Sequence, residues 1–110
     1  MPKLDFETTR NGSVATVRPE GELDLSGATV LEAELERLAE DPELGAIVLD
    51  MRGLEFMDSS GLRLVVVADM RAREAGRRFS LIRGDETVHR VFEITRMSDR
   101  LDFVAAEEVE

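Results

Sequence analysis

The stretch that most restricts the fold of this chain is the apolar run AIVL at positions 46–49, which Gly45 precedes and Asp50 follows. A strand with one face in water alternates apolar and polar residues, and this run does not alternate. Short continuous apolar runs are typical of strands that are buried on both faces. We therefore expect this strand to lie in the centre of a sheet.

Helical patterns lie on both sides of the central strand. Leu31, Leu35 and Leu38 fall on one face of a helix expected over about 27–40, with Ser26 as its N-cap. A second helix is expected over 61–74, after a loop at 51–58. The β-branched residues at 65–67 favour a strand by propensity, but the run is too long for a typical strand and stops at Gly76.

The remaining segments continue the alternation of strand and helix. A strand is expected over 79–83, followed by a third helix that Asp85 caps and a brief strand near 102–104. At the start of the chain, alternating residues over 4–8 and a strand over 14–18 flank Asn11-Gly12, a strong hairpin signal. Pro19 is expected to close the second strand or mark an edge, before a short extended piece at 22–23.

This order predicts an α/β fold with a mixed central β-sheet packed with helices. We expect one domain over residues 1–110, with an acidic tail at about 105–110 that frays. The longest apolar run, Leu64 to Ala68, is far too short to cross a bilayer, and no signal peptide is recognisable, so a cytoplasmic protein is expected.

Composition excludes several classes of function. The chain has no cysteine and one histidine, His89, so we expect no disulfide, no thiolate nucleophile and no zinc centre. No Walker-type glycine-rich loop is present, and no cofactor is expected. The net charge of -10 opposes binding to nucleic acid or to an anionic membrane, which leaves proteins as the expected partners.

The segment Asp58-Ser59-Ser60-Gly61 is the main candidate site, because it joins the central part of the sheet to a helix. Free backbone N–H groups and the helix dipole favour anionic oxygen there, whether a carboxylate, a bound anion or a covalent phosphate. Gly61 has no Cβ, so we expect a partner to approach the serines closely. The alternative is structural, with Asp58, Ser59 or Ser60 serving only as a helix cap.

Two further chemistries are weighed against these. The sequence has no G-x-S-x-G pattern of the kind that surrounds a serine nucleophile. Its one histidine, His89, lies within a predicted helix, where it is not expected to act as a general base, so we expect no enzyme. Asp24 and Asp58 are too few to hold a magnesium ion and are expected to be solvated loop charges, so no metal site is predicted.

The stretch IVLDMRGLEFMDSSGLRLVV resembles the signature of STAS-domain proteins, specifically the bacterial anti-sigma factor antagonists. The elements GELDLSGA and VHRVFEITRM are also similar to segments of that family, and the spacing agrees from about Leu4 to Val104. The chain departs from the family pattern at Met97-Ser98-Asp99-Arg100, where M-S-G-[LI] is common, and it stops before a long last helix.

The resemblance implies a function and a site. Ser60, the hydroxyl residue before the glycine, matches the family's phosphorylated residue, with Ser59 as the alternative position. Asp24, Asp58, Ser59, Ser60 and Gly61 match the region that binds the partner. The implied partners are an anti-sigma factor that is also a serine kinase, and a PP2C-type phosphatase that reverses the modification. The alternative within the same fold is an accessory subunit or scaffold module of a transporter or signalling complex, without a phospho-switch.

Overall fold

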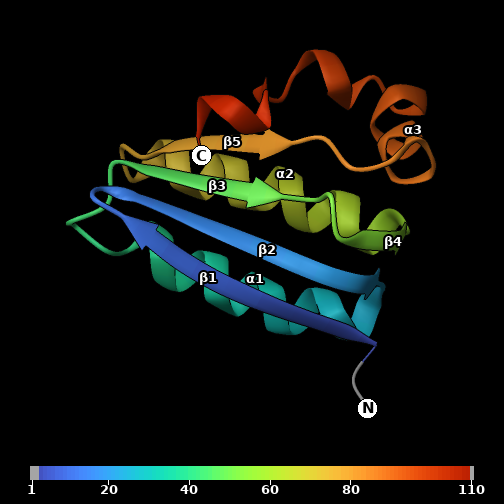
Figure 1. Ribbon diagram of the computed structural model, residues 1–110, viewed down its shortest axis with the longest axis horizontal. Coiled ribbons are helices and arrows are strands. Elements are labelled where there is room, and N and C mark those ends of the chain that lie inside the picture. The colour runs from blue at the N-terminus through green and yellow to red at the C-terminus, as the bar shows by residue number, and fades with distance from the viewer. Residues whose placement is uncertain (1–2, 110) are drawn as a thin grey trace.

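A mixed sheet forms the centre of the computed structural model, which describes residues 3–109 (Figure 1). Its strands run in the order β1-β2-β3-β5-β6, and β4 pairs with the far end of β2. The bounds are β1 Leu4–Asn11, β2 Val14–Leu23, β3 Ala46–Asp50, β4 Leu54–Met57, β5 Arg78–Ile82 and β6 Phe103–Val104. β1 and β2 are antiparallel, and the other pairs are parallel. The predicted α/β fold with a mixed sheet is confirmed.

The central position of β3 is also confirmed. It pairs with β2 on one side and β5 on the other, and Ile47, Val48 and Leu49 are at most 2% exposed. The helices α1 (Leu25–Ala39) and α2 (Ser59–Glu74) lie side by side behind the sheet in Figure 1. The third helix, α3 (Glu86–Ile94), packs next to β4 at one end of the sheet. Its predicted cap is confirmed, since the Asp85 side chain accepts a hydrogen bond from the Val88 N–H at 3.0 Å.

The hairpin forms one residue later than its sequence signal. Asn11 is paired with Val14, which leaves Gly12 and Ser13 as the two loop residues. Gly12 has φ +62°, a left-handed conformation that glycine adopts without a Cβ clash. A two-residue loop with glycine first is a usual way to match the twist of paired strands.

The second strand does not end at Pro19. β2 continues to Leu23, and Pro19 lies between its stretch paired with β3 and its stretch paired with β4. Gly21 donates its N–H to Gly53 O at 3.2 Å on the β4 side. Backbone N–H groups two residues apart in a strand point to the same side, so the nitrogen of Pro19 faces the same side as that of Gly21. At Pro19, β2 is paired with neither β3 nor β4 on this side, so the absence of an N–H on proline removes no hydrogen bond between strands.

The segment 51–58, predicted to be a loop, contains the strand β4. This prediction was wrong because the burial of β4 does not alternate: Leu54 and Met57 are buried, and the two residues between them are exposed. β4 extends the pairing of β2 beyond the end of β3 and ends immediately before α2. It therefore sets the position at which the second helix begins.

The C-terminal part consists of short elements. Arg96 has φ +64° and precedes the 3₁₀ helix η1 (Met97–Asp99), and a second 3₁₀ helix, η2 (Ala106–Glu108), follows β6. The tail that we expected to fray thus has a helical turn as far as the structure describes it, and Glu110 lies outside the described residues. Up to Val109, no long helix follows β6.

Candidate functional site

Two helices begin next to each other at one edge of the sheet. β2 and β4 are parallel neighbours, with Leu23 paired to Met57, so both strands end at the same level. Asp24 follows β2 and begins α1, and Asp58 follows β4 and begins α2. The Asp58 N–H donates to the carbonyl of Leu23 at 3.4 Å, which ties the two junctions together.

Both aspartates cap their helices. Asp24 Oδ1 accepts from the Gly27 N–H at 3.1 Å and from the Ser26 hydroxyl at 2.9 Å. The Gly27 N–H, followed by the Ser26 hydroxyl, lowers the pKa of Asp24 from its usual value. The prediction that Ser26 caps the first helix was wrong, because α1 already begins at Leu25 and Ser26 only donates to the true cap. Asp58 Oδ1 accepts from the Ser60 N–H at 2.9 Å.

The two serine hydroxyls are not used by the helix cap. Ser59 is exposed and Ser60 is half-buried, and within residues 3–109 neither hydroxyl makes a hydrogen bond. Of the three residues that we considered as caps, the structure selects Asp58. The Ser60 hydroxyl is therefore accessible and unengaged at the positive end of the α2 dipole.

A small hollow opens beside Ser60, between the first turns of α1 and α2. Its volume is about 120 Å³. Its lining residues come from both helices: Leu25, Ala28, Thr29, Glu32, Ser60 and Arg63. We call it the Ser60 hollow. Leu25 at its rim is 72% exposed, so it adds an apolar side chain to the surface beside Ser60.

Gly61 packs in the protein core and does not form part of the surface. It is buried, and a Cβ at this position would lie 2.4 Å from Met57 Cγ and 3.0 Å from the Leu23 side chain. The reason that we gave for this glycine, an open backbone that a partner approaches, was wrong. Its missing side chain instead lets the start of α2 pack closely on β2 and β4, which fixes where the serines stand.

The other candidate groups lie elsewhere. His89 is 6% exposed and packs against Phe103 and Phe92, with ring centroids 4.9 and 6.0 Å away. In the described part of the chain, no group of three or more metal-binding side chains comes together. No helix among residues 3–109 is long and apolar enough to cross a bilayer.

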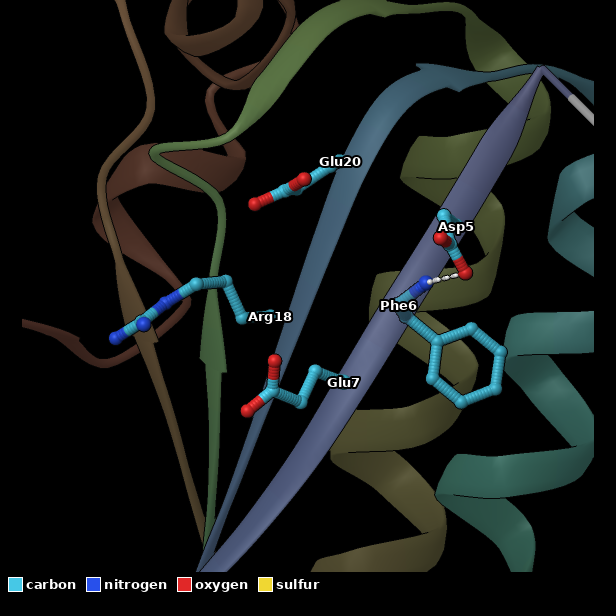
Figure 2. A pocket seen from close by; sticks show the side chains of 5 residues that line it. All are labelled: Asp5, Phe6, Glu7, Arg18 and Glu20. Carbon is cyan, nitrogen blue, oxygen red and sulfur yellow. Dashed lines mark hydrogen bonds between the residues drawn. The ribbon is translucent and has the colours of Figure 1, made fainter.

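A larger hollow of about 280 Å³ lies on the sheet face that points away from α1 and α2. Figure 2 shows Glu7, Arg18 and Glu20 on this face, while the Phe6 ring points to the other side of the sheet. Carboxylates dominate the lining, and Arg18 Nε donates to the buried Asp50 carboxylate at 2.9 Å. The lining of this larger hollow has more carboxylates than that of the Ser60 hollow, where Glu32 is the one carboxylate among the described lining residues.

Sequence reasoning overlooked two residues of the site. Arg63 follows Ser60 by three positions, which is the spacing of neighbours on a helix surface, so the signal was present. Leu25 carried no usable signal, because it falls between the extended piece expected at 22–23 and the cap expected at Ser26, and was assigned to neither. Its position within α1 is what places it at the rim.

A protein-family model described as "Mlab, STAS domain" matches residues 6–105. The chain belongs to the STAS domain family. A relative of this STAS domain is an anti-sigma-B factor antagonist of Staphylococcus aureus, 28% identical over 107 residues that cover 97% of this chain and 98% of the relative. An anti-sigma F factor antagonist of Paenibacillus polymyxa is 26% identical over 92 residues, which cover 84% of this chain and 79% of that protein.

Solved structures show the same fold. The unphosphorylated form of the anti-sigma factor antagonist SpoIIAA superposes with a TM-score of 0.80 at 24% identity, over 94% of this chain and 91% of that one. The phosphorylated form of the Bacillus cell fate determinant SpoIIAA gives a TM-score of 0.74 at 23% identity, over 94% and 95% of the two chains. At this level of identity the likeness shows the STAS fold alone.

Proposed function

We propose that this STAS domain is an anti-sigma factor antagonist whose activity is controlled by phosphorylation at Ser60. In the unphosphorylated form it binds an anti-sigma factor that is also a serine kinase, and the sigma factor is released. The kinase transfers a phosphoryl group from ATP to Ser60, which breaks the complex. A PP2C-type phosphatase removes the phosphate and restores binding.

The relatives support the general role. The S. aureus and P. polymyxa proteins are both named as anti-sigma factor antagonists, and the first aligns over nearly its whole length. SpoIIAA has been solved in phosphorylated and unphosphorylated forms, so a domain of this fold carries a phosphate. These likenesses are the reason for choosing this partner class over others.

Both serine hydroxyls are unengaged, and the observation that carries the choice of Ser60 over Ser59 is its place in the lining of the Ser60 hollow. Asp58 caps α2, so the fold does not need the Ser60 oxygen for a hydrogen bond. The residue is half-buried at the rim of the Ser60 hollow, where a kinase reaches the hydroxyl without unfolding the helix. A structural serine would have been expected to donate or accept within the fold.

Electrostatics explains why phosphorylation alters binding and leaves the fold intact. A phosphoserine adds about -1.5 to -2 charges, and the start of a helix favours negative charge. The modification therefore changes the charge and shape of the outer surface around Ser60. A partner surface that fits the neutral hydroxyl then meets a hydrated dianion, whose desolvation is costly.

The residues proposed to contact the partner lie at one edge. Asp24 and Asp58 begin the two adjacent helices, and Ser59 and Ser60 form the first turn of α2. Gly61 contributes from beneath, by holding α2 against the sheet. In this proposal the domain is a substrate and a binding protein of the cytoplasm, without catalysis of its own and without a metal or cofactor.

Incubation of the chain with the anti-sigma kinases encoded in its own genome, with ATP, tests the proposal. We expect a mass gain of one phosphate that is abolished in Ser60→Ala and retained in the matched control Ser59→Ala. Loss only in Ser59→Ala would move the site by one residue. No modification by any of these kinases would overturn the switch and favour the accessory or scaffold module.

A further inference from the structure

Arg63 lies beside Ser60 at the start of α2. The two residues stand three positions apart on α2, where Cβ atoms are about 5–6 Å apart, and both line the Ser60 hollow. Arg63 is exposed, and its side chain makes no hydrogen bond or ion pair within residues 3–109. An unengaged guanidinium thus shares a hollow with an unengaged hydroxyl.

The other arginines of α2 are engaged. Arg71 lies 3.4 Å from a Glu32 oxygen and 3.3 Å from a Glu36 oxygen, both across on α1. Arg73 Nε donates to Asp69 on its own helix at 3.1 Å. Arg63 differs from both because no carboxylate of the described residues is paired with it, although Glu32 lines the same hollow.

We propose that Arg63 is the internal counter-ion of a phosphate on Ser60. The inference rests on the proposed function and adds the residue that stabilises the modified state. A guanidinium presents several N–H donors in a planar fork that matches two phosphate oxygens. The (i, i+3) spacing lets the fork reach the phosphate without a change in the helix, so the pair forms within the hollow.

The charges around Ser60 explain why a counter-ion is needed. Asp58 bonds to the Ser60 N–H, and Glu32 lines the opposite wall of the Ser60 hollow. A phosphate placed here faces both carboxylates, whose repulsion opposes the favourable helix dipole. Arg63 is the cation that lines the same hollow, and it offsets this repulsion.

The pairing has a consequence for regulation. In the unmodified protein the Arg63 side chain is open to a partner, whereas in the modified protein the phosphate holds it. Phosphorylation then has two effects on the surface: it adds the phosphate dianion, and it pairs the Arg63 guanidinium so that a partner no longer contacts it freely. A phosphate that is held in place is also a defined group for a phosphatase to recognise.

The test uses protein that carries phosphoserine at position 60 through genetic-code expansion, so that no kinase is required. The second pKa of the phosphoserine is measured by phosphorus NMR in wild type, in Arg63→Gln, and in the matched control Arg73→Gln on the same helix. Phosphoserine titrates at about pH 6, and a paired guanidinium favours the dianion. We expect Arg63→Gln to raise this pKa by roughly 0.3 to 1 unit, with Arg73→Gln close to wild type.

Equal values in Arg63→Gln and Arg73→Gln would overturn the proposal. Arg63→Lys, which keeps the charge and loses the fork, is expected to give an intermediate value. Melting of each variant with and without the phosphate provides a second measurement: the difference between the two forms should change only when Arg63 is replaced. The two proposals can fail separately. If Arg63→Gln raises the phosphoserine pKa as expected but no kinase modifies the protein, the proposed function is refuted and the pairing of Arg63 with the phosphate stands.

Discussion

The carboxylate of Asp58 accepts a hydrogen bond from the backbone N–H of Ser60 at 2.9 Å, so the cap of α2 comes from the residue that precedes both serines. This arrangement divides two tasks that one residue often combines. Asp58 satisfies the orphan N–H of the helix, while the Ser60 side chain remains available for chemistry. If Ser60 is modified as proposed, stability and modification depend on different side chains that are two positions apart.

Replacement of the cap should cost stability, and replacement of the serine should not. We expect Asp58→Ala to lower the free energy of unfolding by about 1 kcal/mol, the usual cost of a lost N-cap. Ser60→Ala should stay within about 0.5 kcal/mol of wild type, because its hydroxyl makes no hydrogen bond in the described chain. Urea denaturation of both variants measures this difference, and equal losses would show that Ser60 shares the capping role.

A carboxylate at position 60 should separate folding from binding. We expect Ser60→Asp to remain within about 0.5 kcal/mol of wild type in stability, since the start of a helix favours negative charge. Its affinity for the anti-sigma kinase should fall about tenfold or more, which corresponds to about 1.4 kcal/mol. Calorimetric melts and binding titrations check both values, with Ser60→Asn as the uncharged control. Unfolding of Ser60→Asp, or equal binding by both variants, would contradict this expectation.

Local signals predicted the parts of the fold that neighbouring residues determine. The apolar run at 46–49 identified the central strand, Asp85 identified the start of α3, and Gly76, with φ +78°, identified the end of α2. Each of these depends on backbone chemistry within a few residues. The serines of the candidate site were also selected locally, from their place between a strand and a helix.

Parts that depend on pairing between distant segments were missed. β4 has no alternating pattern and forms because β2 continues beyond β3 and offers an open edge. The role of Gly61 depends on Leu23 and Met57, which only the folded sheet brings beneath it. The position of the Ser60 hollow likewise results from α1 and α2 starting side by side, which no single stretch encodes.

Acidification should weaken the protein through His89. Burial, with a smaller effect from the Arg83 charge, lowers the pKa of His89, and Glu93 opposes this shift. The unfolded chain binds a proton near pH 6.5 while the folded chain resists it, so stability falls as the pH drops below this value. Within residues 3–109 the Nδ1 atom has no hydrogen-bond partner that would stabilise the charged ring.

The variant His89→Leu isolates this contribution. It removes the titrating group and keeps an apolar side chain against Phe92 and Phe103, so its stability should change less than that of wild type between about pH 7 and 5. Carboxylates whose pKa is lowered, such as Glu34 and Asp41, lose their contribution at lower pH and are common to both proteins. Parallel stability curves for the two proteins across this range would rule out the histidine as the cause.

Replacing Gly61 with alanine should reverse the usual helix preference. Alanine is normally better than glycine in a helix by about 1 kcal/mol. Here the added Cβ would lie 2.4 Å from Met57 Cγ, so we expect Gly61→Ala to destabilise the protein by about 1–3 kcal/mol. Gly45→Ala, outside the helices, controls for the added Cβ alone, because that Cβ would meet Ser13 Oγ at an ordinary 3.7 Å.

A double-mutant cycle identifies the clash as the cause. Met57→Ala removes the side chain that the new Cβ would contact, at the cost of a cavity beneath α2. If the clash is responsible, the combined loss of stability in Gly61→Ala with Met57→Ala should be smaller than the sum of the single losses. Additive losses would assign the cost to the Leu23 side chain, which the new Cβ would approach to 3.0 Å, and not to Met57. Since the clash would also shift the first turn of α2, the rate of Ser60 phosphorylation should fall in Gly61→Ala and recover in the double variant.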